Sequence, residues 1–135
     1  MAVQLSVAVR NARLDAIETA IGTAAVLKIR TGAAPADVAT ADSGTVLASL
    51  TRPSDWLAAA SSGSKAKSGT WQDTSADATG TAAHFRIYAS DGTTAHLQGT
   101  VTVTGGGGDL TLDNVSIASG QSVTISSFSL VDANA

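Results

Sequence analysis

The two histidines, His84 and His96, are the first side chains to consider for metal binding or acid–base catalysis, because the chain has no cysteine. Apolar and polar residues alternate through 82–90 and 94–103, which places both histidines on the polar faces of two strands. Pairing of those strands puts the histidines four ladder positions apart, too far to share one metal ion. We interpret them as polar side chains at an exterior or subunit surface, and predict no metal site and no catalytic residue.

Aspartates and glycines are the next candidates for a binding site. Asp73 and Asp77 lie in the loop WQDTSADATG, whose composition can supply oxygen ligands to calcium. The twelve-residue pattern of a calcium loop is absent, so capping of turns is the favoured interpretation. No Lys-Ser or Lys-Thr pair follows the run Gly105–Gly108, which predicts a bent hairpin connection rather than a phosphate cradle. No cofactor is expected.

Composition limits the class of protein further. The 135 residues suit one domain, but only two Trp, two Phe and one Tyr are available to fill a core. We expect this thin core to be completed by neighbouring subunits. A net charge of −3 predicts no direct binding of nucleic acid. No apolar run reaches the roughly 20 residues of a membrane span, and residues 1–15 show no secretory leader, so we expect synthesis in the cytosol.

A helical period runs through residues 5–21, and Gly22 is expected to end the helix. Alanines form a second, smooth strip beside the main face, so the helix is expected to lie against a sheet or another subunit. Both an ordinary covering helix and an intersubunit helix fit this pattern. The residues of the main face are Val7, Arg10, Leu14, Ile17 and Ile21.

Alternation with a period of two begins after this helix. Residues 26–31 and 45–50 are predicted strands, and the polar segment 33–44 is predicted to be a surface connection. Residues 54–60 fit either a short helical turn or a strand. Residues 61–69 are predicted to form an exposed loop in which Lys65 and Lys67 are simply solvated.

The remainder of the chain is predicted to be wholly β. Several short strands at this spacing favour a mainly β fold, a single-domain antiparallel β-sandwich or barrel with an N-terminal α-helix. The domain comprises an arm and helix over 1–22 and a β-sandwich over 23–135. The expected strands cover residues 68–73, 82–90, 94–104, 109–113 and 121–131.

The alternation also fixes how strands 82–90 and 94–104 pair. A two-residue turn at Asp91-Gly92 would set apolar side chains opposite polar ones, whereas a three- or five-residue loop pairs Ile87 with Leu97 and Phe85 with Gly99. We predict the second register, in which Phe85 covers the bare backbone of Gly99. The other face then carries His84, Arg86, Tyr88 and His96, and we expect it to be wet.

Four stretches together cover most of the chain, and the resemblance lies in their overall sequence rather than in a catalytic motif. They are MAVQLSVAVRNARLDAIETAIGTAAVLKIRTG, PSDWLAAASSGSKAKSGTW, AAHFRIYASDGTT and NVSIASGQSVTISSFSLVDANA. Together they resemble a family of small, uncharacterised structural proteins encoded among the virion genes of tailed bacteriophages. The resemblance implies a virion component made in the host cytoplasm. It does not distinguish the head from the tail or a fibre.

Within a virion, the features of the chain favour the head. A capsid decoration, or cement, protein needs a small rigid sandwich and a core augmented by subunit contacts. It bridges copies of the major capsid protein and shifts the equilibrium toward the intact shell. We expect a homo-oligomer, with a trimer as the first expectation. The candidate interface residues are Val3, Leu5, Val7, Val9, Arg10, His84, Arg86, Tyr88 and His96.

Two other classes compete with this hypothesis. A tail-, baseplate- or fibre-associated adhesin would bind a host surface polymer through loops 33–44, 61–69 and 105–108, with Trp56 and Trp71 as sugar-stacking platforms. Both tryptophans are more readily interpreted as core residues in a chain this poor in aromatics. A glycan hydrolase needs paired carboxylates on rigid strands, whereas nearly all of the eleven acids here lie in turn-like contexts. We therefore predict that the protein is not an enzyme.

Overall fold

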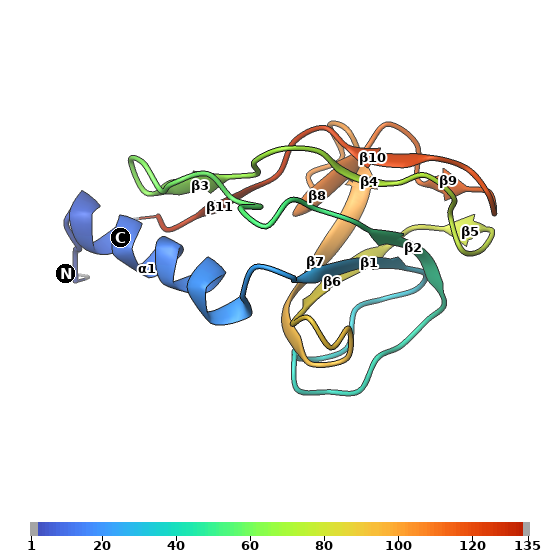
Figure 1. The fold of residues 1–135 in the computed structure, drawn as a ribbon, viewed down its shortest axis with the longest axis horizontal. Helices are drawn as coiled ribbons and strands as arrows, with labels where there is room; N and C mark the ends of the chain where they lie inside the picture. Colours follow the sequence, from blue (N-terminus) through green and yellow to red (C-terminus); the bar gives the residue numbers. More distant parts are fainter. Residues whose placement is uncertain (1–2, 134–135) are drawn as a thin grey trace.

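A computed structural model describes residues 3–133 and shows one helix beside a curled arrangement of strands (Figure 1). The mainly β fold with an N-terminal helix, consistent with a β-sandwich or barrel-like single domain, is confirmed. Helix α1 spans Val7–Ile21 and starts after Ser6, whose hydroxyl accepts the Val9 N–H. No helix of the described residues is long and apolar enough to cross a membrane.

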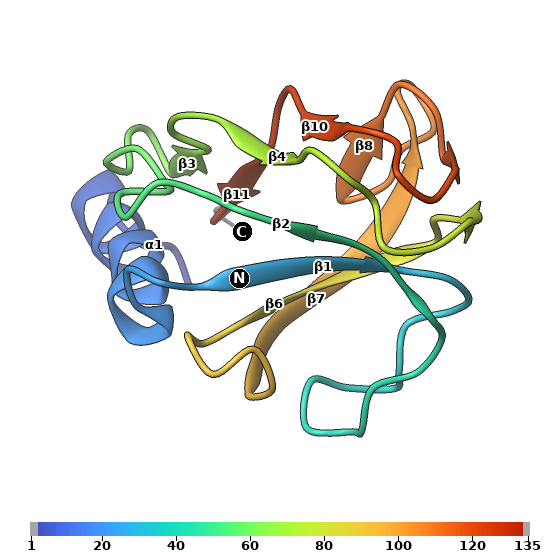
Figure 2. The ribbon, with the colours of Figure 1, turned by 45° about the vertical axis from the view of Figure 1, so that its right-hand side comes forward.

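The main sheet has five strands in the order β2-β1-β6-β7-β8. Three two-stranded sheets, β10-β4, β11-β3 and β5-β9, lie around it (Figure 2). The strands of the main sheet are β1 (Val26–Arg30), β2 (Val46–Leu50), β6 (His84–Tyr88), β7 (Ala95–Val103) and β8 (Leu110–Leu112). The short strands are β3 (Ser64–Ala66), β4 (Trp71–Asp73), β5 (Gly80–Thr81), β9 (Ser116–Ile117), β10 (Val123–Ile125) and β11 (Ser129–Val131).

The predicted register of β6 and β7 is confirmed. Ile87 pairs with Leu97, and Phe85 pairs with Gly99. A Cβ on Gly99 would lie 2.7 Å from Cε1 of Phe85, so the ring fills the space that any side chain there would need. An irregularity after Ile87 shifts the end of the ladder by one residue, so Tyr88 faces Ala95 rather than His96.

The connection through Gly105–Gly108 is not the predicted hairpin. Strand β8 runs parallel to β7, with Val101 opposite Leu110. After β7 the chain must therefore return along that strand before β8 can pair with it in the same direction. This return needs glycine because a Cβ on Gly106 or Gly108 would lie 2.8 Å from the Thr102 side chain.

The C-terminal segment forms two strands in place of the single predicted one. Strand β10 pairs with β4, and β11 pairs with β3. Phe128 lies between these two strands, where the chain leaves the sheet with β4 and enters the sheet with β3. The side of the chain that carries apolar residues changes at this point. Residues 54–60 form neither a helix nor a strand, and contribute a single bridge from Leu57 to Lys67.

Four aromatic rings form the centre of the core, which confirms the prediction for both tryptophans. Trp56 and Trp71 are fully buried, with ring centroids 5.9 Å apart. Phe128 lies 5.4 Å from Trp71 and 5.7 Å from Phe85, the latter edge to face. The indole N–H of Trp56 donates to the Gly22 carbonyl, which ties the end of α1 to this cluster.

Candidate functional site

Segment 33–44 folds over the outer face of β1 and β6 and binds it through a charged network. Asp42 lies at the centre of this network. Its Oδ1 accepts from Arg86 and from the Tyr88 hydroxyl, each at 2.8 Å, and its Oδ2 accepts from Arg30 at 2.7 Å. Arg30 also donates to Tyr88 at 3.2 Å. One carboxylate thus joins two neighbouring strands to the segment that covers them.

Backbone carbonyls of the same segment complete the binding of Arg86. Its Nη2 donates to the carbonyls of Asp37 and Thr40 and to Oε1 of Gln98. Gln98 in turn donates to the Pro35 carbonyl at 2.8 Å. The guanidinium is therefore bound at many points, and the segment acts as a strap across the sheet.

This strap overturns the expectation of a wet face. His84, Arg86 and Tyr88 are buried, and segment 33–44 covers Arg86 and Tyr88 through the bonds described above. They are interior residues rather than the exterior contact face expected from the alternation, while His96 alone of that set is exposed. The Nδ1 of His84 lies 2.7 Å from the Gly32 carbonyl, and its Nε2 is buried without a hydrogen-bond partner among the described residues.

The network also shifts the acidity of Asp42. Burial by itself would raise the pKa of this carboxyl, but hydrogen bonds from Tyr88 and Arg86 and the charges of Arg30 and Arg86 outweigh that effect. The pKa of Asp42 is therefore held below its usual value. The carboxylate stays charged at neutral pH, as its role between two buried guanidinium groups requires.

A second ionic cluster holds helix α1 against β3. Lys65 is buried, and its Nζ lies 2.7 Å from Asp15, 3.0 Å from Glu18 and 2.9 Å from the Ala58 carbonyl. The interpretation of 61–69 as an exposed loop with solvated lysines is therefore wrong for Lys65. Lys67 is half-buried and lies over the Trp71 ring.

The acids of α1 bind the backbone of the same region as well as Lys65. Asp15 accepts from the Ala60 N–H and Glu18 from the Leu57 N–H, each at 3.0 Å. Burial alone would lower the pKa of Lys65, but the hydrogen bonds that it donates to Asp15 and Glu18 raise it. The hydrogen bond from Lys65 lowers the pKa of Asp15. The helix is therefore attached by these polar side chains as well as by the buried Leu14 and Ile21.

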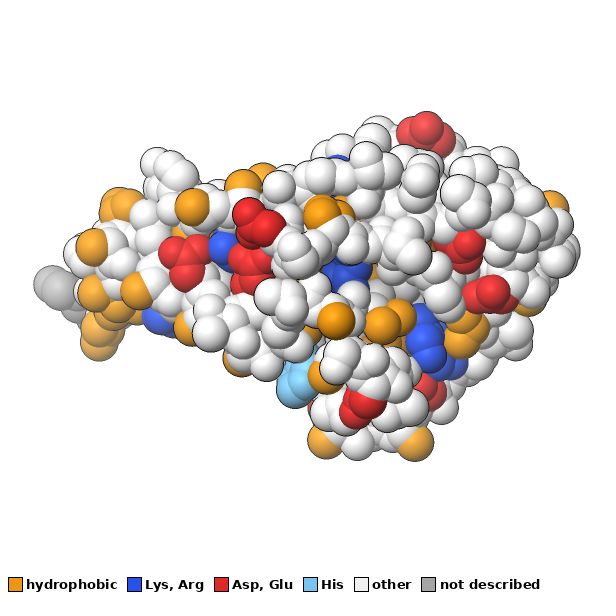
Figure 3. All heavy atoms as spheres, viewed as in Figure 1, with side chains coloured by type: hydrophobic (Ala, Val, Ile, Leu, Met, Phe, Trp, Pro, Cys, Tyr) orange, Lys and Arg blue, Asp and Glu red, His pale blue; other side chains and the backbone are white. Residues whose placement is uncertain are grey.

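Of the five large hydrophobic residues exposed within residues 3–133, three lie before or at the start of α1, at an end of the molecule where Figure 3 shows several hydrophobic side chains. Val3 is 84% exposed, Val7 47% and Val9 46%. We call these three residues the valine tip. They belong to the predicted interface set and lie before and within the first turn of the helix, where Val7 and Val9 are two positions apart and point to different sides.

The other two N-terminal candidates lie differently. Leu5 is half-buried. Arg10 is also half-buried and donates from Nη1 to the Asp132 carbonyl at 3.1 Å, which fixes α1 to the end of β11. Arg10 therefore serves as an internal tie in this structure.

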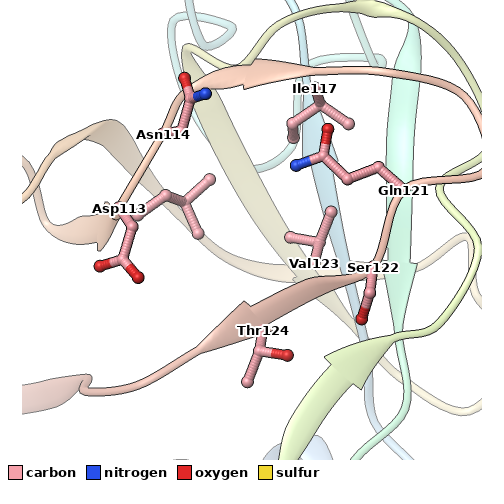
Figure 4. Close-up of a pocket in the computed structure, with 8 residues that line it drawn as sticks. Asp113, Asn114, Ile117, Gln121, Ser122, Val123 and Thr124 are labelled. Atoms are coloured by element: carbon pink, nitrogen blue, oxygen red, sulfur yellow. The ribbon is translucent and has the colours of Figure 1, made fainter.

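Cavities elsewhere offer no cluster of chemically active groups among residues 3–133. Figure 4 shows a shallow pocket of about 230 Å³ between β8 and β10, with Asp113 as its carboxylate and Asn114, Gln121 and Ser122 beside it. Asp73 accepts from the Ser75 N–H and thus caps a turn, as predicted. No group of three potential metal-ligating side chains is found within the described range.

Arg52 is a further residue that the sequence did not single out. Its guanidinium lies 4.8 Å from the Trp56 ring and 5.5 Å from the Trp71 ring. None of its nitrogens has a hydrogen-bond partner within residues 3–133. Burial lowers the pKa of Arg52 to about 10.

Neither Asp42 nor Lys65 carried a signal that would have identified it. Each lies in a polar, turn-rich segment and finds its partners far along the chain. Comparison with known proteins gives no match to any family model, curated protein or solved structure.

Proposed function

We propose that this chain is a non-enzymatic structural protein of a tailed-phage virion, most specifically a capsid decoration protein that bridges major capsid subunits. The proposal rests on the resemblance of the sequence together with one structural observation, the valine tip. Val3, Val7 and Val9 place apolar surface at the same end of a domain whose buried arginines and lysine are bound internally. Large apolar side chains exposed at one end of a domain suit a contact with another protein.

Docking through the valine tip stabilises a shell by mass action. The tip binds where capsid subunits meet, and a bound protein that prefers the intact shell shifts the equilibrium toward it. The stabilisation from many weak contacts repeated over the shell lattice adds up, so no single contact has to be tight. The internal ties suit this role. The Asp42 network holds segment 33–44 on the sheet, and the Lys65 cluster holds α1 on β3, so both attachments favour a rigid domain.

Two measurements test the proposal on particles of the phage that encodes the chain. Quantitative mass spectrometry of purified particles is expected to give hundreds of copies per particle, and a density map is expected to place the protein on the head. A few copies at the tail or baseplate would refute the head assignment and favour the adhesin. Absence from the particle would refute the virion assignment altogether.

A variant pair tests the docking surface. Val9→Asp places a charge on the valine tip and is expected to reduce binding to shells at least tenfold. Val103→Asp is the matched control, because Val103 is exposed to a similar degree, 45% against 46% for Val9, and belongs to β7. Equal binding by the two variants would contradict docking through the tip.

A further inference from the structure

Basic side chains are concentrated on the outer face of β1 and β6. Lys28 lies directly opposite Arg86 across the two strands, and Arg30 lies opposite His84. Three of the eight lysines and arginines of the chain are therefore neighbours here, although its net charge is −3. We call Lys28, Arg30, His84 and Arg86 the basic block. Like charges directly opposite one another destabilise a sheet, so the packing of the sheet alone does not account for this block.

The acids around the basic block do not balance its charge. Asp42 is the one carboxylate among the described residues that forms an ion pair with the block. Three further acids nearby, Asp37, Asp91 and Asp109, accept hydrogen bonds from threonines instead. Lys28 donates to a backbone carbonyl at 2.9 Å. Three cations therefore share one paired carboxylate, and the block keeps an excess of positive charge.

The strap that covers the block makes its contacts outside the hydrophobic core. Residues 33–44 are all exposed or half-buried, and none belongs to the core cluster or packs against it. The bonds described above join the strap to polar side chains of β1, β6 and β7, and Figure 1 shows it as the blue-green loop below β1 and β6. Its ends meet, because the Thr31 N–H donates to the Thr45 carbonyl at 3.1 Å. A segment attached in this way can open as a unit while the sheet and the core stay folded.

Asp42 lies in the basic block as a bound carboxylate group would. Its two oxygens accept from Arg30 at 2.7 Å and from Arg86 and the Tyr88 hydroxyl at 2.8 Å. Two guanidinium groups and a hydroxyl that converge from neighbouring strands suit the recognition of a carboxylate. A hollow of about 310 Å³ lies between the edge of the strap and the loop after β6, and Arg86 is part of its lining. A further acidic group can therefore approach Arg86 from this side.

We propose that the basic block is a binding site for an acidic segment of a partner protein, and that Asp42 occupies this site until the partner displaces the strap. One carboxylate of the segment takes the place of Asp42 between Arg30 and Arg86. A second carboxylate pairs with Lys28, which forms no ion pair with any carboxylate of the described residues. The strap and the partner compete for the same donors, so the strap acts as an internal inhibitor. This inference does not depend on the assignment to a virion.

The closed strap determines the expected affinity. Only chains with an open strap bind the partner, so the apparent Kd equals the intrinsic Kd divided by the open fraction. An open fraction of about 1% weakens binding by the native chain about a hundredfold. Loss of the Asp42 charge removes the competing carboxylate and raises the open fraction, so we expect binding to become at least tenfold tighter. Added salt should weaken the binding, because the contact is ionic.

Fluorescence anisotropy of a labelled hexaglutamate peptide, titrated with the full chain, tests the site. Asp42→Asn is expected to bind the peptide at least tenfold more tightly than the native chain. Asp37→Asn is the matched control, because it removes the same charge from the same strap and leaves Asp42 in the block. This control should bind as the native chain does. Addition of Arg30→Gln to Asp42→Asn should abolish the gain.

Nuclear magnetic resonance gives a second readout on the native chain, for which no variant has to fold. Excess peptide is expected to shift the amide signals of residues 33–44 and the guanidinium signals of Arg30 and Arg86. The indole N–H signals of Trp56 and Trp71, which are hydrogen-bonded within the core, should stay in place because the core does not open. The same two signals show whether each variant is folded.

Equal binding by Asp42→Asn and the native chain would overturn the inference, and so would a gain by Asp37→Asn as large as that by Asp42→Asn. A gain that persists when Arg30→Gln is added would also overturn it. Strap signals of the native chain that do not respond to excess peptide would have the same meaning. A single-stranded oligonucleotide of equal charge that binds Asp42→Asn more tightly than the peptide would refute the choice of an acidic protein segment as the partner.

Discussion

Replacing Asp42 with Asn keeps the size of the side chain but removes the charge that faces Arg30 and Arg86. Both guanidinium groups are buried, with side chains 8% and 2% exposed. Removal of one partner from a buried ion pair costs about 3–5 kcal/mol. The Asp42 side chain is 34% exposed, and carbonyls still bind Arg86, so we expect a smaller loss of about 2–3 kcal/mol in the free energy of unfolding.

Urea and thermal unfolding measure this loss. For a chain of this length about 1 kcal/mol lowers Tm by roughly 3–4 °C, so Asp42→Asn should lower Tm by about 6–12 °C. Asp37→Asn is the matched control, because Asp37 lies in the same strap but its carboxylate accepts from the nearby Thr40 rather than from a buried arginine. We expect the control to lose less than about 1 kcal/mol.

Acid provides an independent check of the same reasoning. The pKa of Asp42 is lower in the folded protein than its usual value, so its contribution is complete above about pH 4 and is lost as the pH falls through the folded pKa. The difference in stability between the native chain and Asp42→Asn should therefore shrink below about pH 4. A constant difference across that range, or equal Tm values for Asp42→Asn and Asp37→Asn, would refute the assignment of Asp42 as the centre of the strap.

Three further substitutions probe other parts of the fold by urea unfolding. Lys65→Ala should lower the free energy of unfolding by about 3 kcal/mol. The amides of α1 should lose protection from hydrogen exchange before those of the main sheet. Simultaneous loss in both would contradict the role of Lys65 in holding the helix. Gly99→Ala should cost about 1–3 kcal/mol because of the contact with Phe85, whereas no loss would mean that the ring moves freely. Arg52→Met should be neutral or stabilising, because it removes a buried charge without a hydrogen-bond partner; a loss above about 2 kcal/mol would show that the contacts with Trp56 and Trp71 outweigh desolvation.

The sequence predicted correctly those features that depend on residue types and their spacing within a short segment. The alternation in 82–90 and 94–104 fixed the pairing of Phe85 with Gly99, because a shift by one residue would have turned every apolar side chain to the wrong face. The scarcity of aromatics likewise predicted that Trp56 and Trp71 are buried. Both inferences needed only residue types and their spacing.

Features that depend on contacts between residues far apart in the sequence could not be predicted from such patterns. The polar face of β6 is buried because segment 33–44 returns to cover it, and nothing in AAPADVATADSG distinguishes Asp42 from an aspartate of an ordinary surface turn. Lys65 was misjudged for the same reason, since its partners Asp15 and Glu18 lie on a helix about fifty residues earlier. On α1 the helical period predicted the inward side of Leu14, Ile17 and Ile21, but not the bonds of Asp15 and Glu18 to Lys65.

The attachment of α1 to Asp132 has a consequence for synthesis. Arg10 and Arg13 contact a residue that lies more than a hundred positions later, and Lys65 is also made well after the helix. The helix therefore leaves the ribosome long before its docking site exists, and fifteen residues without that site are marginal as a helix in water. We expect the N-terminal segment to fluctuate until Asp132 has been made, and the closing of the helix onto β3 and β11 to be a late step of folding.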